Sequence, residues 1–221
     1  MTSFGALRLA PPLSPRTRLY SLPPIGVGTP VVESLTGYLM RLADAHCVAI
    51  GALVATEILP VVCPNGLAGV PPATWLGRTA AHMNGTGDLA SAVVAALAAL
   101  TGRQELASLT MLRWSGILSE SGLLRFGRRR RAWCPACYAE ALEQRAILSE
   151  PLLWSIAAVT ACARHRLRLL ERCPYVDCGR PLPVLAAFGR PGHCSYCRRL
   201  LVQEGETERD AAVRQPASSW E

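Results

Sequence analysis

The amino-acid sequence predicts a mainly α N-terminal domain with a helix-turn-helix-like start, followed by two small α+β modules that metal stabilises. Apolar residues recur at helical spacing between positions 34 and 109, which predicts the helical part. Seven of the nine cysteines and one of the four histidines form four close pairs between positions 134 and 197, which predicts the modules. We expect a Pro-rich extended arm (1–30), a helical domain (31–127), a basic joint with the first module (128–172), the second module (173–203) and a disordered tail (204–221).

The first thirty residues contain six prolines. Proline at this density sustains neither a helix nor a central strand. We expect an extended, disordered arm, with docking on a partner as the alternative.

The helical domain begins at Ser34, a candidate N-cap. Its first helix has an apolar stripe up to Leu42, and the stripe leaves Arg41 and Asp44 facing away. A second apolar segment follows after a short break and ends at Pro60. Two short helices joined by a tight turn are typical of a helix-turn-helix, and of many other small helical domains.

The Gly- and Pro-rich residues 60–87 predict irregular structure with Trp75 as an anchor. The clearest helix follows, capped by Asp88 and ended by Gly102. A shorter helix around Leu106 completes the predicted domain.

The four Cys/His pairs have the spacing of metal ligands. Two thiolates three positions apart in a tight turn chelate one ion, and two such pairs supply the four ligands of a closed structural zinc site. The pairs therefore predict two tandem zinc ribbons with two Zn²⁺ ions per chain. The predicted ligands are Cys134, Cys137, Cys162 and His165 for the first ion, and Cys173, Cys178, Cys194 and Cys197 for the second.

We favour this sequential pairing over a cross-braced one. RING domains keep their second and third pairs nearly adjacent, whereas seven residues separate His165 from Cys173. The wider spacing of Cys173 and Cys178 leaves the ligands of the second site open, with His193 as a substitute. A disulfide framework has no support because no secretory signal is evident, and buried free cysteines would have no reason to recur at this spacing.

Secondary structure within the ribbons is predicted from short patterns. Residues 138–147 read as a helix and residues 152–159 as a strand. Residues 166–169 alternate Arg and Leu, as a strand with two faces would. Residues 181–185 and 200–202 are expected to pair as strands. The remaining Cys47 and Cys63 lack a paired spacing, so we expect buried core residues there rather than a third metal site.

The net charge of +7 comes from arginine alone, since the chain has no lysine. A basic chain with zinc ribbons favours a nucleic-acid or ribonucleoprotein partner. The arginine run before the first ribbon is expected to bind phosphate, with a solvated linker as the alternative. The candidate nucleic-acid-binding residues are Arg125, Arg128, Arg129, Arg130, Arg131, Arg166, Arg168, Arg198 and Arg199.

No catalytic constellation is recognisable. The sequence has no Walker-type glycine loop, no G-x-S-x-G elbow and no H-E-x-x-H motif, so we expect a protein that is not an enzyme. Its longest apolar runs are too short to span a bilayer, so no membrane partner is expected. We expect a cytoplasmic protein of a prokaryote.

Several motifs occur together along the chain: Glu33-Ser34-Leu35 with Tyr38, Arg41, Leu42 and Ala43; Trp133-Cys134-Pro135 with Cys137-Tyr138; Cys162-x2-His165; Leu170; and Cys173-Pro174. Together they resemble the TniQ family of Tn7-like and CRISPR-associated transposons. The resemblance implies a helix-turn-helix domain with tandem zinc ribbons, and an adaptor that links a target-recognition complex to the AAA+ ATPase that recruits the transposase. Because the chain is compact, it is more similar to members that serve a CRISPR effector complex with its guide RNA and reach target DNA through that complex.

Two other classes stay open. A zinc-containing helix-turn-helix transcription regulator would use the same helical domain and basic joint to bind duplex DNA without partners. A RING-type ligase module would need cross-braced metals, which the gap after His165 disfavours.

Overall fold

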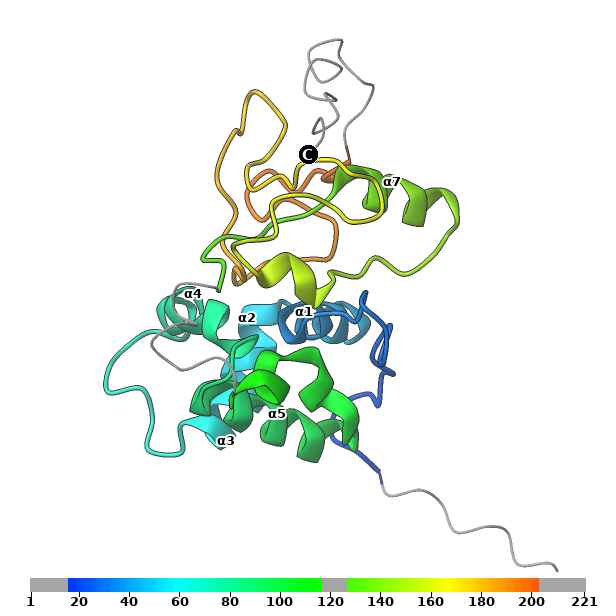
Figure 1. Ribbon diagram of the computed structural model, residues 1–221. Coiled ribbons are helices and arrows are strands. Elements are labelled where there is room, and N and C mark those ends of the chain that lie inside the picture. Colours follow the sequence, from blue (N-terminus) through cyan, green and yellow to red (C-terminus); the bar gives the residue numbers. More distant parts are fainter. Residues whose placement is uncertain (1–15, 117–126, 203–221) are drawn as a thin grey trace, which may run out of the picture.

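The structure is a computed structural model that describes residues 16–116 and 127–202. Figure 1 shows a helical part, which holds α1 to α5, beside a second part, here called the ribbon part, which holds α7 and is made mainly of turns and loops. Within the described residues, β-structure is limited to isolated bridges. The helical elements are α1 (Leu35–Ala45), α2 (Ile50–Leu53), the π-helix η1 (Val54–Ile58), α3 (Leu59–Val62), α4 (Pro72–Met83), α5 (Asp88–Thr101), the 3₁₀-helices η2 (Glu105–Leu109), η3 (Met111–Trp114) and η4 (Leu152–Ser155), and α7 (Pro135–Glu143).

Helix α1 begins as predicted. The Ser34 hydroxyl accepts a hydrogen bond from the Gly37 amide at 3.0 Å, which satisfies one of the free amides of the first turn. The prediction that Arg41 faces away is wrong, because its side chain is buried against the Glu33 carboxylate. Nε of Arg41 donates to Glu33 Oε2 at 2.8 Å. Arg41 and Glu33 therefore form a buried ion pair, and Arg41 does not face solvent as expected.

The second helical segment does not stop at Pro60, contrary to the prediction. The π-helix η1 allows the helix to continue past Pro60, since the Leu59 amide donates to the Val54 carbonyl five residues back. Widening the helix in this way accommodates a proline, which has no amide hydrogen to donate. Residues 50–62 therefore form one continuous helical run, and it lies at 103° to α1 after a four-residue turn.

The prediction of irregular structure over residues 60–87 is also wrong, because α4 occupies its second half. Pro72 lies in the first turn of α4, where a missing amide costs nothing. Leu76, Ala80 and Met83 then form its buried stripe. The turn after α4 leads into α5 at 101°.

Helix α5 differs from the prediction at its start and agrees at its end. Gly87 occupies the cap position, and Asp88 is the first helical residue. Gly102 ends the helix in the left-handed conformation (φ 73°), which glycine adopts without steric cost.

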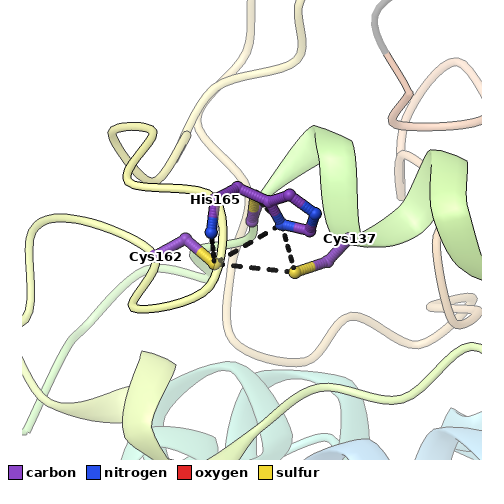
Figure 2. Close-up of side chains that lie close together, drawn as sticks. Cys137, Cys162 and His165 are labelled. Atoms are coloured by element: carbon purple, nitrogen blue, oxygen red, sulfur yellow. Dashed lines mark hydrogen bonds between the residues drawn. The ribbon is translucent and has the colours of Figure 1, made fainter.

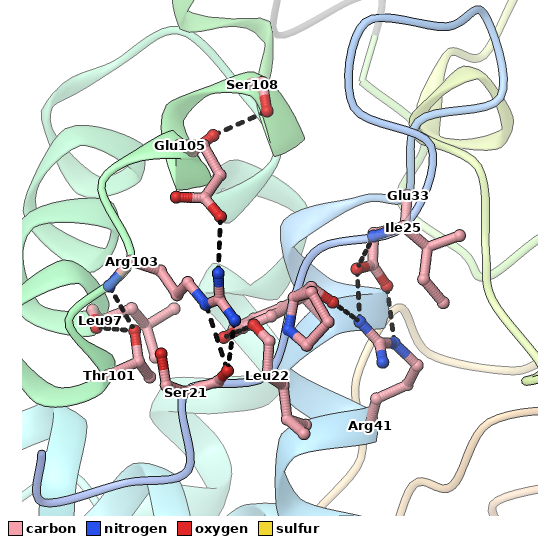
Figure 3. A network of polar contacts seen from close by, with 12 residues as sticks. Ser21, Leu22, Ile25, Glu33, Arg41, Leu97, Thr101, Arg103, Glu105 and Ser108 are labelled. Carbon is pink, nitrogen blue, oxygen red and sulfur yellow. Dashed lines mark hydrogen bonds and ion pairs between the residues drawn. The ribbon is translucent and has the colours of Figure 1, made fainter.

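Residues 16–33 lie against the helical domain, so the expected disordered arm is wrong for this part of it. Leu19 is buried in the helical core. Arg103 donates two hydrogen bonds to the Ser21 carbonyl, at 2.6 and 3.1 Å. The buried Glu33 accepts from the Ile25 amide at 2.7 Å as well as from Arg41 (Figure 3). Residues 1–15 and the predicted tail lie outside the described residues.

The ribbon part is organised around one core that both Cys/His clusters share. Its buried residues include Trp133, Tyr138 and Trp154 together with four of the cysteines. Helix α7 begins at Pro135 and ends at Glu143, earlier at both ends than predicted. The predicted strand over 152–159 is the 3₁₀-helix η4 followed by turns.

The predicted pairing of residues 181–185 with 200–202 is wrong as well. Pro181 instead bridges to Arg172, and Leu200 bridges to His193. Each bridge closes a turn that holds one Cys pair, so the short segments pair locally around the ligands.

The two parts are joined by contacts that include the helical core itself. Leu185 comes from the ribbon part and is buried among the helices. The Gly51 amide, in α2, donates to the Ala187 carbonyl at 2.9 Å. The Ser34 amide donates to the Glu150 carbonyl at 2.7 Å beside the start of α1.

Candidate metal centres

The first cluster brings together Cys134, Cys137, Cys162 and His165, as the sequential pairing predicts. Their ligand atoms all lie within 4.8 Å of one another. Nδ1 of His165 lies 3.6 Å from the Cys134 sulfur and 3.2 Å from the Cys137 sulfur, and the sulfurs of Cys137 and Cys162 are 3.6 Å apart. Figure 2 shows Cys137, on α7, pointing toward the turn that carries Cys162 and His165.

The second cluster brings together Cys173, Cys178, Cys194 and Cys197 within the same limit. The sulfurs of Cys173 and Cys197 are 3.6 Å apart, and those of Cys178 and Cys194 are 3.8 Å apart. His193 takes no part, since its ring lies at the Pro191 carbonyl instead.

Both clusters have the dimensions of a tetrahedral zinc site. With Zn–S bonds of about 2.3 Å and Zn–N bonds of about 2.0 Å, tetrahedral ligands lie about 3.8 Å apart for two sulfurs and about 3.5 Å apart for sulfur and nitrogen. The distances in both clusters agree with these values to within a few tenths of an ångström. Each cluster could therefore hold one ion such as zinc with all four positions filled by protein.

The electrostatics of the thiols favour the metal-binding form at one cysteine in each cluster. The pKa of Cys134 falls to about 5, chiefly because Cys137 donates a hydrogen bond to its sulfur. Burial raises the pKa of Cys197, but hydrogen bonds from the Arg199 backbone and side chain outweigh it and bring the pKa to about 6. A thiolate is the form that binds a metal.

Three of the four pairs share one backbone design. The residue directly after the second ligand is left-handed in each: Arg166 (φ 56°), Gly179 (φ 54°) and Arg198 (φ 66°). This conformation lets the Arg166 amide return to the Cys162 carbonyl at 2.8 Å, and the Arg198 amide to the Cys194 carbonyl at 3.1 Å. The predicted strand over residues 166–169 therefore fails at its first residue.

The first pair is positioned differently, by the start of a helix. Cys134 is the N-cap of α7 and Cys137 lies in its first turn, so the amides of that turn face the cluster. Helix amides and the helix dipole stabilise negative charge at this end, which suits thiolates.

Glu140 is a residue of this site that the sequence analysis missed. It lies on α7 three positions after Cys137, and its Oε2 is 3.4 Å from Nε2 of His165. A carboxylate there fixes the imidazole with Nδ1 turned toward the cluster and makes it a stronger ligand. Glu140 is itself held by Arg164 and by Gln144. Its spacing from Cys137, one helical turn, is the signal that could have identified it.

The prediction that the arginine run before the first ribbon binds phosphate is wrong for two of its arginines. Arg128 pairs with Glu171, and Nη2 donates to the Val159 carbonyl at 2.6 Å. The side chain of Arg131 is 2% exposed, and Nε donates to Glu150 Oε1 at 2.7 Å. Neither guanidinium is available to a phosphate, because both are used inside the fold.

The other predicted nucleic-acid residues have varied surroundings. Arg129, Arg130, Arg166 and Arg168 are exposed. Arg198 lies over the Phe188 ring, whereas Arg199 lies over the Tyr175 ring and pairs with Asp177. Arg125 lies outside the described residues.

Cys47 is exposed, contrary to the expectation that it is a core residue, and Cys63 is partly buried against the helical core. Among residues 16–116 and 127–202, neither cysteine belongs to a group of potential metal ligands. His46 instead stacks on Tyr20 with ring centroids 4.1 Å apart.

In the part of the chain that the structure describes, no single helix is long and apolar enough to cross a membrane. Two helix pairs reach that length only across the bends of 103° and 101° noted above.

Comparison with known proteins identifies the family. A search of curated proteins finds no match to this chain. The family model TniQ matches residues 24–169, a span that holds the whole helical domain and the first cluster. The motifs of the first cluster and of α1 lie within this match, and the second cluster lies beyond it. The chain belongs to the TniQ family, a family of transposition-associated proteins.

Proposed function

We propose that this protein is a non-catalytic targeting adaptor in DNA transposition. One of its surfaces would bind a target-recognition complex, for which an RNA-guided CRISPR effector is our first candidate. Another would bind the AAA+ regulator that recruits the transposase. Membership of the TniQ family is the observation that carries this proposal.

The way the two parts are joined supports an adaptor. The backbone bond between Gly51 and Ala187, the ion pair between Arg190 and Asp44 and the burial of Leu185 hold the ribbon part on the helices. A bridge works best when its two binding surfaces keep a fixed relation, because less freedom is then lost on assembly. Metal in the clusters would add to this rigidity, since small ribbons gain their shape from bound zinc.

A helix-turn-helix DNA-binding regulator is the second candidate, favoured by the 103° crossing of α1 with the following helical run. Two observations weigh against it. Residues 50–62, which take the place of a recognition helix, contain no Arg, Asn or Gln to read base edges. The start of α2, where such helices contact bases, is covered by Ala187: a Cβ at Gly51 would lie 2.8 Å from the Ala187 Cβ.

Reconstituted transposition distinguishes the two candidates. Target complex, AAA+ regulator, transposase and donor DNA are combined with and without this chain, and insertions are mapped by sequencing. The adaptor proposal expects insertion at the selected target only when the chain is present, with little stable complex between the chain and duplex DNA alone.

Targeted insertion at an equal rate without the chain would refute the adaptor. Tight, sequence-specific binding of the purified chain to a duplex would instead support the regulator.

A further inference from the structure

The second cluster is surrounded by arginine–aromatic pairs that the metal site does not use. Arg180 lies over the Tyr196 ring at 5.0 Å from its centroid, and Arg198 lies over the Phe188 ring at the same distance. These four residues form what we call the arginine–aromatic surface. Tyr196 and Arg198 lie two positions apart, on either side of Cys197, so one member of each pair belongs to the same short segment.

The aromatic rings of this surface are presented to solvent. Phe188 is 56% exposed and Tyr196 is 45% exposed. Val176, between Cys173 and Cys178 of the same cluster, is fully exposed. Exposed aromatic side chains that gather in one place mark a binding surface more often than scattered ones do. Each ring carries a guanidinium over one face, and about half of each aromatic side chain is exposed to solvent.

The charge of the segment points to an anionic ligand. Residues 172–202 contain five arginines and a single acidic residue, Asp177, which is already paired with Arg199. Within the described residues, no carboxylate lies within ion-pair distance of Arg180 or Arg198. Aromatic rings together with unneutralised guanidiniums match a strand that offers both bases and phosphates.

The shape of the surface favours a single strand over a duplex. No helix occurs between residues 156 and 202, all of which the structure describes, and the surface is built from tight turns. A duplex keeps its base faces stacked inside and is read by elements that enter a groove. An unpaired strand exposes its base faces to aromatic side chains.

We infer that the arginine–aromatic surface binds single-stranded nucleic acid, with bases stacking on Tyr196 and Phe188 and phosphates held by Arg180 and Arg198. This binding site goes beyond the proposed adaptor role, and it can be tested on the purified chain without any transposition partner.

The test is a fluorescence anisotropy titration of the full, zinc-loaded chain. Labelled oligo(dT) and oligo(U) of about a dozen nucleotides are compared with a duplex of the same length. A small binding domain covers a single strand of about this length. We expect at least one of the two single strands to bind. The comparison of their affinities shows whether the surface prefers the DNA strand or the RNA strand. We expect the duplex to bind at least tenfold more weakly.

Substitutions at Tyr196 separate stacking from general apolar contact. Tyr196→Phe keeps a ring and should bind as the wild type does, whereas Tyr196→Leu should weaken binding roughly tenfold, as loss of one stacked base would. Trp114→Leu is the matched control, because Trp114 is a 43% exposed aromatic residue in the helical part. Replacing Arg180 and Arg198 by Ala should flatten the dependence of log K on log salt by about 0.7 per arginine.

Circular dichroism and zinc content, measured on every variant, show that a loss of binding is not a loss of fold. Equal binding of duplex and single strand, or wild-type binding by Tyr196→Leu, would overturn the inference. So would the absence of binding to either single strand at micromolar protein.

Discussion

Replacing Arg131 should destabilise the fold far more than replacing its neighbour Arg129. The Arg131 side chain is 2% exposed and that of Glu150 is 8% exposed, so Arg131→Met leaves a buried carboxylate without its partner. Breaking such a pair costs about 3–5 kcal/mol of unfolding free energy. Arg131→Met also removes the bond from Nη1 to the His193 carbonyl at 2.9 Å, which ties the joint to the second cluster.

The surroundings of Arg131 favour its charged form. Burial lowers the pKa of Arg131, but the Glu150 carboxylate raises it by more, so the net pKa lies above its ordinary value. Tyr138 belongs to the same network, since its hydroxyl donates to Glu150 at 2.9 Å. Burial and the nearby Glu150 charge raise the pKa of Tyr138, which keeps that hydroxyl protonated and able to donate.

The assay is urea denaturation of the zinc-loaded chain, followed by tryptophan fluorescence, to which the buried Trp133 and Trp154 of the ribbon part contribute. The exposed Arg129 is the matched control, and Arg129→Met should change the unfolding free energy by no more than about 0.5 kcal/mol. The double variant Arg131→Met with Glu150→Leu should recover most of the loss, because no buried charge is left unpaired. If Arg131→Met and Arg129→Met lowered the unfolding free energy by the same small amount, the buried ion pair would not be stabilising. Arg131 would then be part of a solvated linker.

Three further predictions concern other sites. Glu140→Gln should weaken zinc binding by about 10–100-fold through loss of the carboxylate at His165, measured by competition with a chromophoric chelator; unchanged affinity would contradict this role. Gly51→Ala should destabilise the contact between the two parts, because the new Cβ would lie 2.8 Å from the Ala187 Cβ; hydrogen exchange of the Gly51-region amides should speed up, and unchanged exchange would argue against a tight contact. Ser34→Ala should lower the unfolding free energy by about 1 kcal/mol through loss of the α1 cap, and a neutral result in thermal unfolding would exclude that contribution.

The metal ligands were predictable because their signal is local. Each pair lies within one turn, so spacing alone identifies it, and the gap between His165 and Cys173 was enough to order the pairs. Helix caps follow the same logic, as Ser34 and Gly102 show. The spacing of the pairs did not reveal that both clusters share one core, which depends on long-range packing around Trp133.

Several incorrect predictions concern arginines whose ion-pair partners were not recognisable from the sequence around them. The arginine run resembled a phosphate clamp, yet Glu171 and Glu150, which lie 43 and 19 positions away from Arg128 and Arg131, bury two of its members. In the same way, Glu33 turns Arg41 inward. These carboxylates carry no local pattern that would mark them as partners of an arginine.

Helix α4 was missed for a different reason. Pro71, Pro72 and Gly77 lower the intrinsic helix propensity of the segment. Burial of Leu76, Ala80 and Met83 in the helical core outweighs that cost.

Native mass spectrometry of the purified chain tests most directly the central claim that each of the two clusters holds one metal ion. We expect a mass increase that corresponds to two zinc ions per chain. Removal of both ions by a chelator should unfold the ribbon part while the circular dichroism of the helices persists. A chain that carries one zinc ion or none, with its ribbon part still folded, would contradict the account.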